Sequence, residues 1–181
     1  MPRLFVAIDF PDAVRLRLES LCNGVPGARW VTPEQIHLTL RFIGEVDNGV
    51  FADVAETLAR IDTAPFTLRL EGVGHFPPRG QPRVLWAGVG DGAPLARLHD
   101  MLEARLRRLG LEPDRRNFAP HVTLARLKQA RLGKVRDFLA HCDGFATESF
   151  PVTEFHLYSS TLGARSAIHA IEASYALGAA G

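Results

Sequence analysis

A four-residue phrase occurs twice in this chain, as HLTL at residues 37–40 and as HVTL at residues 121–124. Both copies alternate polar and aliphatic residues, which is typical of β-strands. Because successive side chains of a strand point to opposite faces, His37 and Thr39 share one face and the aliphatic residues share the other. We expect the aliphatic faces to enter a hydrophobic core and the two His/Thr faces to meet in a cleft.

The rest of the sequence predicts clusters of strands separated by helices. Leucines at helical spacing indicate a helix over residues 93–109, and Asp47 has the position of an N-cap for a helix that reaches about residue 61. Two shorter helices are expected after Pro11 and over residues 131–142. The strands are expected at residues 3–10, 27–31, 36–44, 66–76, 83–90 and 121–127, near 155–160 and near 167–175.

Clustered strands between helices favour the α+β class with antiparallel sheets over a doubly wound parallel sheet. The repeated phrase favours a single domain, residues 1–181, built of two pseudo-symmetric lobes. We expect the helices on the outside and a central cleft that carries the two motif strands. The approximate lobes are residues 1–91 and 92–181, and an exchange of strands between them is left open.

The composition is that of an ordinary globular protein, with 46% hydrophobic residues, 23% charged residues and a formal net charge of +1. No run approaches the 18 apolar residues of a membrane span, and the first residues read as a strand rather than a signal peptide. We therefore expect a soluble, cytoplasmic monomer without a membrane partner. Cys22 and Cys142 are predicted to be buried small hydrophobic residues, not a disulfide or a metal site.

Arginine dominates the basic residues, since only Lys128 and Lys134 among 21 are lysine. Arginine suits bidentate contacts with phosphate, although a codon bias toward arginine and alanine would give the same composition. One stretch permits a hypothesis of another class, a non-catalytic RNA-binding module, although a solvated helix face and loop is the favoured interpretation. That stretch contains Arg105, Arg107, Arg108, Arg115 and Arg116.

Two histidines and two threonines on facing strands suit the chemistry of a phosphodiester. Histidine gains or loses a proton near neutral pH, so His37 and His121 can act as an acid and a base on opposite sides of one bond. The hydroxyl groups of Thr39 and Thr123 can bind two phosphoryl oxygens. A nearby arginine such as Arg126 can stabilise the negative charge that builds up.

A metal site is the competing interpretation of the two motifs. Catalytic zinc usually takes three protein ligands, and neither a carboxylate nor a third histidine shares the spacing of the pair. The remaining histidines occur singly and are predicted to be surface or hydrogen-bonded residues. We therefore expect a site that needs no metal and no cofactor. The remaining histidines are His75, His99, His141, His156 and His169.

At these residues the chain resembles the two-histidine phosphoesterase superfamily. Within it, the chain is most similar to the LigT-like RNA 2′,3′-cyclic phosphodiesterases, also called 2′-5′ RNA ligases. The similarity extends over nearly the whole chain, because the flanks match as well as the motifs. It is carried by RLFVAIDFPD (3–12), RWVTPEQIHLTLRFIGEV (29–46), FPPRGQPRVLWAGV (76–89) and FAPHVTLAR (118–126).

The resemblance implies hydrolysis of RNA 2′,3′-cyclic phosphate ends to a 2′-phosphate. It implies that His37 donates a proton to the leaving ribose oxygen and that His121 is the base that activates water. Thr39 and Thr123 match phosphate-binding threonines, and Arg126 is a candidate phosphate or ribose contact. Two aromatic residues, Phe42 and Phe76, are candidates for stacking on a base, with core packing as the alternative.

Two points stay open at this stage. The same acid and base, run in reverse, would join tRNA halves through a 2′-5′ linkage, so ligation is an alternative function. The turn near the C-terminus departs from the glycine-rich form of the family, since it holds Ala164, Arg165 and Ser166. This departure leaves the preferred RNA end and base undetermined.

Overall fold

The computed structural model describes residues 1–164 and 166–178, so Arg165 of the atypical turn lies outside the described residues. The fold is α+β, as predicted, with antiparallel strand pairing throughout the two sheets of the described residues. The strands are β1 (Arg3–Ile8), β2 (Ala28–Trp30), β3 (Leu38–Glu45), β4 (Phe66–Leu68), β5 (Leu70–Phe76), β6 (Val84–Val89), β7 (Val122–Leu127), β8 (Phe150–Val152), β9 (Glu154–Leu162) and β10 (Ala167–Ala176). The helices are α1 (Asp12–Glu19), the 3-10 helix η1 (Pro33–Gln35), α2 (Asn48–Leu58), α3 (Ala93–Arg108) and α4 (Leu132–His141).

One sheet of eight strands forms the framework of the molecule. Its order is β10-β9-β1-β3-β7-β6-β5, and β2 pairs with β7 off this path. The motif strands β3 and β7 are neighbours at the centre, where they are joined by the single register pair Leu38–Val122. The sheet thus consists of two halves linked between the two motifs.

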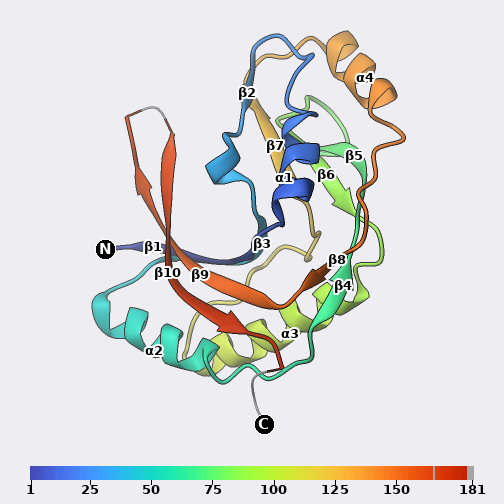
Figure 1. The fold of residues 1–181 in the computed structure, drawn as a ribbon. Coiled ribbons are helices and arrows are strands. Elements are labelled where there is room, and N and C mark those ends of the chain that lie inside the picture. The colour runs from blue at the N-terminus through green and yellow to red at the C-terminus, as the bar shows by residue number, and fades with distance from the viewer. Residues whose placement is uncertain (165, 179–181) are drawn as a thin grey trace.

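Strands from both ends of the chain meet in the half that contains β3, because β9 pairs with β1 and β10 pairs with β9. Figure 1 shows α2 and α3 along this half, below the sheet, while α1 and α4 lie beside β2, β5, β6 and β7. The β9–β10 hairpin extends well beyond the rest of its half (Figure 1). The two halves therefore carry different helices on their outer sides.

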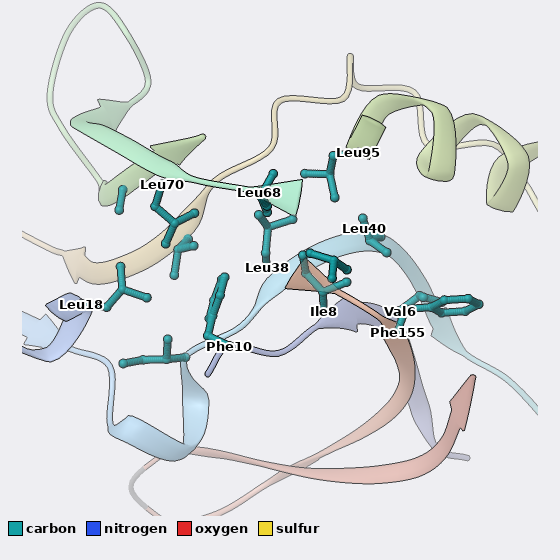
Figure 2. Packing of buried hydrophobic residues seen from close by; sticks show 14 of the residues in the cluster. Val6, Ile8, Phe10, Leu18, Leu38, Leu40, Leu68, Leu70, Leu95 and Phe155 are labelled. Carbon is teal, nitrogen blue, oxygen red and sulfur yellow. The ribbon is translucent and has the colours of Figure 1, made fainter. Parts of the chain in front are cut away.

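The main core lies between the sheet and these helices. Leu38 of β3 is fully buried, and Figure 2 shows it pointing toward Ile8 and Leu68 in the packed interior. Leu95 of α3 also enters this core, as the leucine stripe of residues 93–109 predicts. Burial of such side chains stabilises the fold by about 25 cal/mol per Å² of apolar surface.

Local sequence signals account for most of the elements. The Asp47 side chain accepts a hydrogen bond of 2.9 Å from the Val50 N–H and so caps α2, as expected. The strand predicted over residues 66–76 is interrupted at Arg69: β4 pairs with β8 in a small second sheet, while β5 pairs with β6. Leu68 and Leu70 are buried, although they belong to separate strands. Alternation within one continuous strand would bury the same two residues, so the break could not be predicted from the sequence.

Both cysteines are free thiols and are partly buried. Burial raises the pKa of Cys22 to about 11, which keeps this thiol protonated and unreactive near neutral pH. Within residues 1–164 and 166–178, none of the helices has the length and hydropathy to cross a membrane.

Candidate active site

The two motif histidines stand directly before the two central strands. His37 follows η1 and precedes β3, and His121 precedes β7. Leu38 and Val122 are directly opposed and fully buried in the core. Because side chains alternate along each strand, the residues that flank this pair, which include both histidines and both threonines of the motifs, point to the other face of the sheet. We call this side the motif face.

Each motif has a β-bulge at the same position, its fourth residue. Thr39 pairs with Ala7 and Arg41 pairs with Val6, which leaves Leu40 without a partner on β1. The strand therefore gains one residue, and two consecutive side chains, Leu40 and Arg41, are buried. Phe42 consequently returns to the motif face, where its register partner is Phe5.

The second motif repeats this irregularity. Thr123 pairs with Trp86 and Ala125 pairs with Leu85, so Leu124 is the unpaired residue of β7. Arg126 consequently lies on the motif face and is exposed. Strict alternation would have turned Arg126 to the core face, because it is three residues from Thr123. The bulges therefore bring two of the predicted site residues, Phe42 and Arg126, to the same side as the histidines.

His121 is fixed by its own backbone neighbourhood. Its Nδ1 lies 2.7 Å from the carbonyl oxygen of Ala119, which accepts the Nδ1 proton and leaves Nε2 for other partners. The Phe76 ring packs against it edge-on, with a centroid distance of 4.9 Å. Partial burial lowers the pKa of His121, the Ala119 carbonyl opposes this effect, and the charges of Arg116 and Arg126 lower the pKa further.

His37 lies among aromatic rings instead. Its ring centroid is 4.9 Å from Phe5, 6.0 Å from Tyr158 and 5.3 Å from His169, the last pair being perpendicular. Burial lowers the pKa of His37 to about 4, and the charge of His169 adds to this shift, while a backbone hydrogen bond with Gln35 opposes it. His37 and His121 are thus both bonded to a backbone group two residues earlier.

A polar network holds the turn that precedes His37. Arg15 of α1 forms an ion pair with Asp9 and donates to the carbonyl oxygens of Pro33 at 2.5 Å and Ile36 at 3.2 Å. Burial raises the pKa of Tyr158 to about 12, and the neighbouring Asp9 carboxylate, which accepts a hydrogen bond from the phenol, contributes to the rise. These contacts fix the direction from which the imidazole enters the motif face.

The β9–β10 hairpin supplies side chains that the sequence analysis did not assign to the site. Gln35 Nε2 donates to the Ala167 carbonyl at 2.9 Å, which ties the hairpin to the His37 turn. His169 was expected to be a surface or hydrogen-bonded histidine; instead it packs against His37, and its Nδ1 is buried without a partner among the described residues. No sequence signal reveals this contact, because it depends on the pairing of β10 with β9 and of β9 with β1.

The two candidate stacking residues differ in exposure. Phe42 is 49% exposed, with Phe5 at a centroid distance of 6.0 Å, so it is available to a ligand. Phe76 is half-buried between Trp86 at 5.4 Å and His121 at 4.9 Å. Across residues 1–164 and 166–178, no three His, Cys, Asp or Glu side chains come together as a metal site.

Known proteins share this arrangement along nearly the whole chain. The family model of the 2′-5′ RNA ligase superfamily matches residues 10–164. An RNA 2′,3′-cyclic phosphodiesterase of Archaeoglobus fulgidus is 36% identical over 173 residues, which cover 92% of this chain and 96% of the relative. The protein of the same name from Aeropyrum pernix is 48% identical over 118 residues, or 65% of this chain and 66% of the relative.

Solved structures agree with the sequence matches. A Thermus thermophilus protein superposes with a TM-score of 0.83 at 30% identity, covering 99% of this chain and 100% of that one. E. coli LigT in complex with 3′-AMP gives a TM-score of 0.79 at 30% identity, covering 98% and 99%. With the family model extending over most of the chain and the fold shared from end to end, this chain belongs to the 2′-5′ RNA ligase superfamily, as its two motifs predicted.

Proposed function

We propose that this protein hydrolyses the 2′,3′-cyclic phosphate at the end of an RNA chain and leaves a 2′-phosphate. The observation that carries the proposal is the single Leu38–Val122 pair, which puts two histidines and two threonines on one face of one sheet. The names of the relatives, RNA 2′,3′-cyclic phosphodiesterases at 36% and 48% identity, support the same substrate class.

In this mechanism His121 acts as the base. With its Nδ1 proton donated to the Ala119 carbonyl, neutral His121 has a lone pair on Nε2 that accepts a proton from water. The water oxygen attacks phosphorus while the bond from phosphorus to the ribose 3′-oxygen breaks. His37 donates its proton to that 3′-oxygen, so a 3′-hydroxyl and a 2′-phosphate result. Exchange with solvent then restores both protonation states.

The threonine hydroxyl groups and the arginine guanidinium contact different parts of the reacting phosphate. The hydroxyl groups of Thr39 and Thr123 donate to the two non-bridging oxygens. The Arg126 guanidinium stabilises the charge that grows in the transition state, where a fixed donor is worth more than in water. Phe42, being exposed, offers a surface on which a base can stack.

Because the pKa of His37 is low, binding of the anionic substrate is needed to protonate this side chain. A proton donor must carry its proton, but burial lowers the pKa of His37 to about 4 in the enzyme without substrate. The negative charge of a bound phosphodiester favours the protonated imidazole and raises this pKa. His37 therefore takes up its proton when the anionic substrate binds, and it is neutral in the free enzyme at pH 7.

The test is product analysis on an oligonucleotide with a 2′,3′-cyclic phosphate end, with chelator present. We expect a 2′-phosphate product at an undiminished rate, because no step uses a metal. His37→Ala and His121→Ala should each lower turnover by about two to four orders of magnitude, and full activity in either variant would overturn the mechanism. A substrate with sulfur at the 3′-bridging position needs no protonation of its leaving group. It should restore activity to the His37 variant but not to the His121 variant.

Ligation is a second candidate function, favoured by the family description, 2′-5′ RNA ligase superfamily. For ligation a 5′-hydroxyl takes the place of water: His121 accepts its proton as its oxygen attacks phosphorus, and His37 protonates the leaving 3′-oxygen. Incubation with tRNA half-molecules, followed by a search for a 2′-5′-linked product, separates the two functions. Hydrolysis alone would exclude ligation as the main activity.

A further inference from the structure

A second arginine stands beside Arg126 on the motif face. Arg29 of β2 is the register partner of Arg126 in the β2–β7 pair, and both side chains are exposed. The next pair, Trp30 with Ala125, faces the core, where Trp30 packs on Phe138 of α4 at a centroid distance of 5.8 Å. Since alternate residues point to opposite faces, both arginines extend over the motif face.

The two halves differ in one strand, because β2 pairs with β7 and no equivalent strand among the described residues pairs with β3. After the single Leu38–Val122 pair, β3 diverges from β7, and β2 occupies the edge of β7 that β3 leaves. In the described part of the chain, β3 pairs with β1 and β7 alone and has no strand in the corresponding place. Arg29 therefore adds charge to the His121 half only.

We propose that Arg29, next to Arg126, forms a subsite for a second phosphate, the one attached to the 5′-oxygen of the terminal ribose, while Arg126 contacts the reacting phosphate. This inference rests on the proposed function and sharpens its substrate class. The preferred substrate is an RNA end that carries a phosphate on both sides of its last ribose, rather than a nucleoside 2′,3′-cyclic phosphate alone.

Charge and spacing both favour this subsite. Guanidinium groups bind phosphate through paired, charge-assisted hydrogen bonds. Two guanidinium-bearing side chains next to each other on one face raise the positive potential that an approaching anion meets there. From Thr123 to Arg126 the strand advances by at most about 10 Å, at ~3.3 Å per residue, which one nucleotide and a long arginine side chain can span.

The row of residues across the sheet also gives the subsite a direction. It runs from Phe76 through Val84 and Arg126 to Arg29, with each neighbouring pair in register. One end of the row is apolar and aromatic, and the other end is cationic. The RNA backbone therefore leaves the reacting phosphate toward β2, away from the ring of Phe76.

Three substrates test the subsite: a nucleoside 2′,3′-cyclic phosphate, the same compound with a 5′-phosphate, and a dinucleotide with a cyclic phosphate end. In the wild type we expect kcat/KM to rise about tenfold or more when the 5′-phosphate is present, as for one charge-assisted contact. Arg29→Gln should remove most of this ratio for both phosphorylated substrates. Arg136→Gln, which removes an exposed arginine from α4 behind the sheet, should keep the ratio.

The salt dependence provides a second measurement that needs no variant. With rising salt, kcat/KM should fall more steeply for the 5′-phosphorylated compound than for the nucleoside compound, because salt screens the added charge pair. Equal efficiency and equal slopes in the wild type would overturn the subsite while the hydrolase function stood. A wild-type ratio that survives Arg29→Gln would overturn the role of Arg29. Failure to hydrolyse any of the three compounds would instead contradict the proposed function itself.

Discussion

The two halves of the sheet place the same motif in the same local geometry but surround it with different chemistry. In both, the histidine bonds to a backbone group two residues earlier and the motif leucine sits at a bulge. His37, however, is enclosed by Phe5, Tyr158 and His169, whereas His121 lies beside arginines. The motif thus sets where the imidazoles stand, and their neighbours set how strongly each holds a proton.

The fifth residue after each histidine shows the same division. Phe42 and Arg126 occupy matched positions beyond the two bulges, and both are exposed on the motif face. One offers an aromatic ring and the other a guanidinium. A pair of matched strands can therefore present an apolar contact from one half and an anion contact from the other.

The largest expected effect concerns the histidines, where the halves should be equally necessary. His37→Ala and His121→Ala should each lower kcat by about 10²–10⁴-fold, the usual contribution of a positioned acid or base. Single-turnover kinetics on a cyclic-phosphate oligonucleotide measures the chemical step directly. If kcat fell less than tenfold in one of the variants, that histidine would not be an acid or base of the reaction.

The halves should next differ in how stability depends on pH. The pKa of His37 is about 4 in the folded protein and near 6.5 in an unfolded chain, so the unfolded state alone binds this proton between those values. The contribution of His37 is fully present above pH 6.5 and is lost as the pH falls toward 4. The loss amounts to up to about 3 kcal/mol.

Urea unfolding at several pH values measures this contribution as the difference between the wild type and His37→Gln. The wild type should lose more free energy of unfolding between pH 6.5 and 4 than the variant does. Parallel curves would contradict the buried, neutral state of His37. The same comparison with His121→Gln reports the other half, where partial burial also lowers the pKa.

A third prediction isolates His169, which belongs to the His37 half alone. His169→Gln removes a titratable ring 5.3 Å from His37, so the pKa of His37 should rise while that of His121 stays in place. NMR titration of the two imidazoles reads both values in one experiment. A shift at both histidines, or at neither, would show that His169 does not act on His37 through its charge.

Substitutions at the matched positions Phe42 and Arg126 should have different effects on kcat/KM and on its salt dependence, because only Arg126 is charged. Arg126→Gln is expected to lower kcat/KM by about tenfold or more and to flatten its salt dependence, as for one lost phosphate contact. Phe42→Leu should cost less than tenfold and leave the salt slope unchanged, because it removes stacking surface without charge. Identical salt slopes in the two variants would refute this division.

The smallest effect is expected in the packing behind His121. A methyl group on Gly74 would overlap the Trp86 indole, which packs on Phe76 and through it on His121. Gly74→Ala should lower the free energy of unfolding by about 1–3 kcal/mol, as overpacking does, and should reduce kcat/KM only a few-fold. Gly133→Ala in α4 meets no atom within 4 Å and serves as the control; its stability should not fall. A stable Gly74→Ala with full activity would show that the indole can move aside without disturbing the site.

Much of this structure was predictable because its signals are local. The leucine stripe of α3 and the N-cap at Asp47 depend on neighbours a few residues away. The same is true of the four motif residues, since alternation along a strand is a property of the backbone. The break at Arg69 and the pairing of β4 with β8 were not predictable, because two separate strands and one continuous strand show the same apolar pattern there.

The sequence by itself determined the two motifs and their alternation: a histidine and a threonine on one face of a strand, in each of two copies. Tertiary structure decided the rest, because its causes lie in pairings between distant segments. Bulges opposite β1 and β6 turned Phe42 and Arg126 to the motif face. Strict alternation along the strands would have pointed both side chains to the core face. The β9–β10 hairpin brought His169 to His37, and β2 brought Arg29 to Arg126. Proton affinity and charge depend on such contacts across space, and a linear pattern does not contain them.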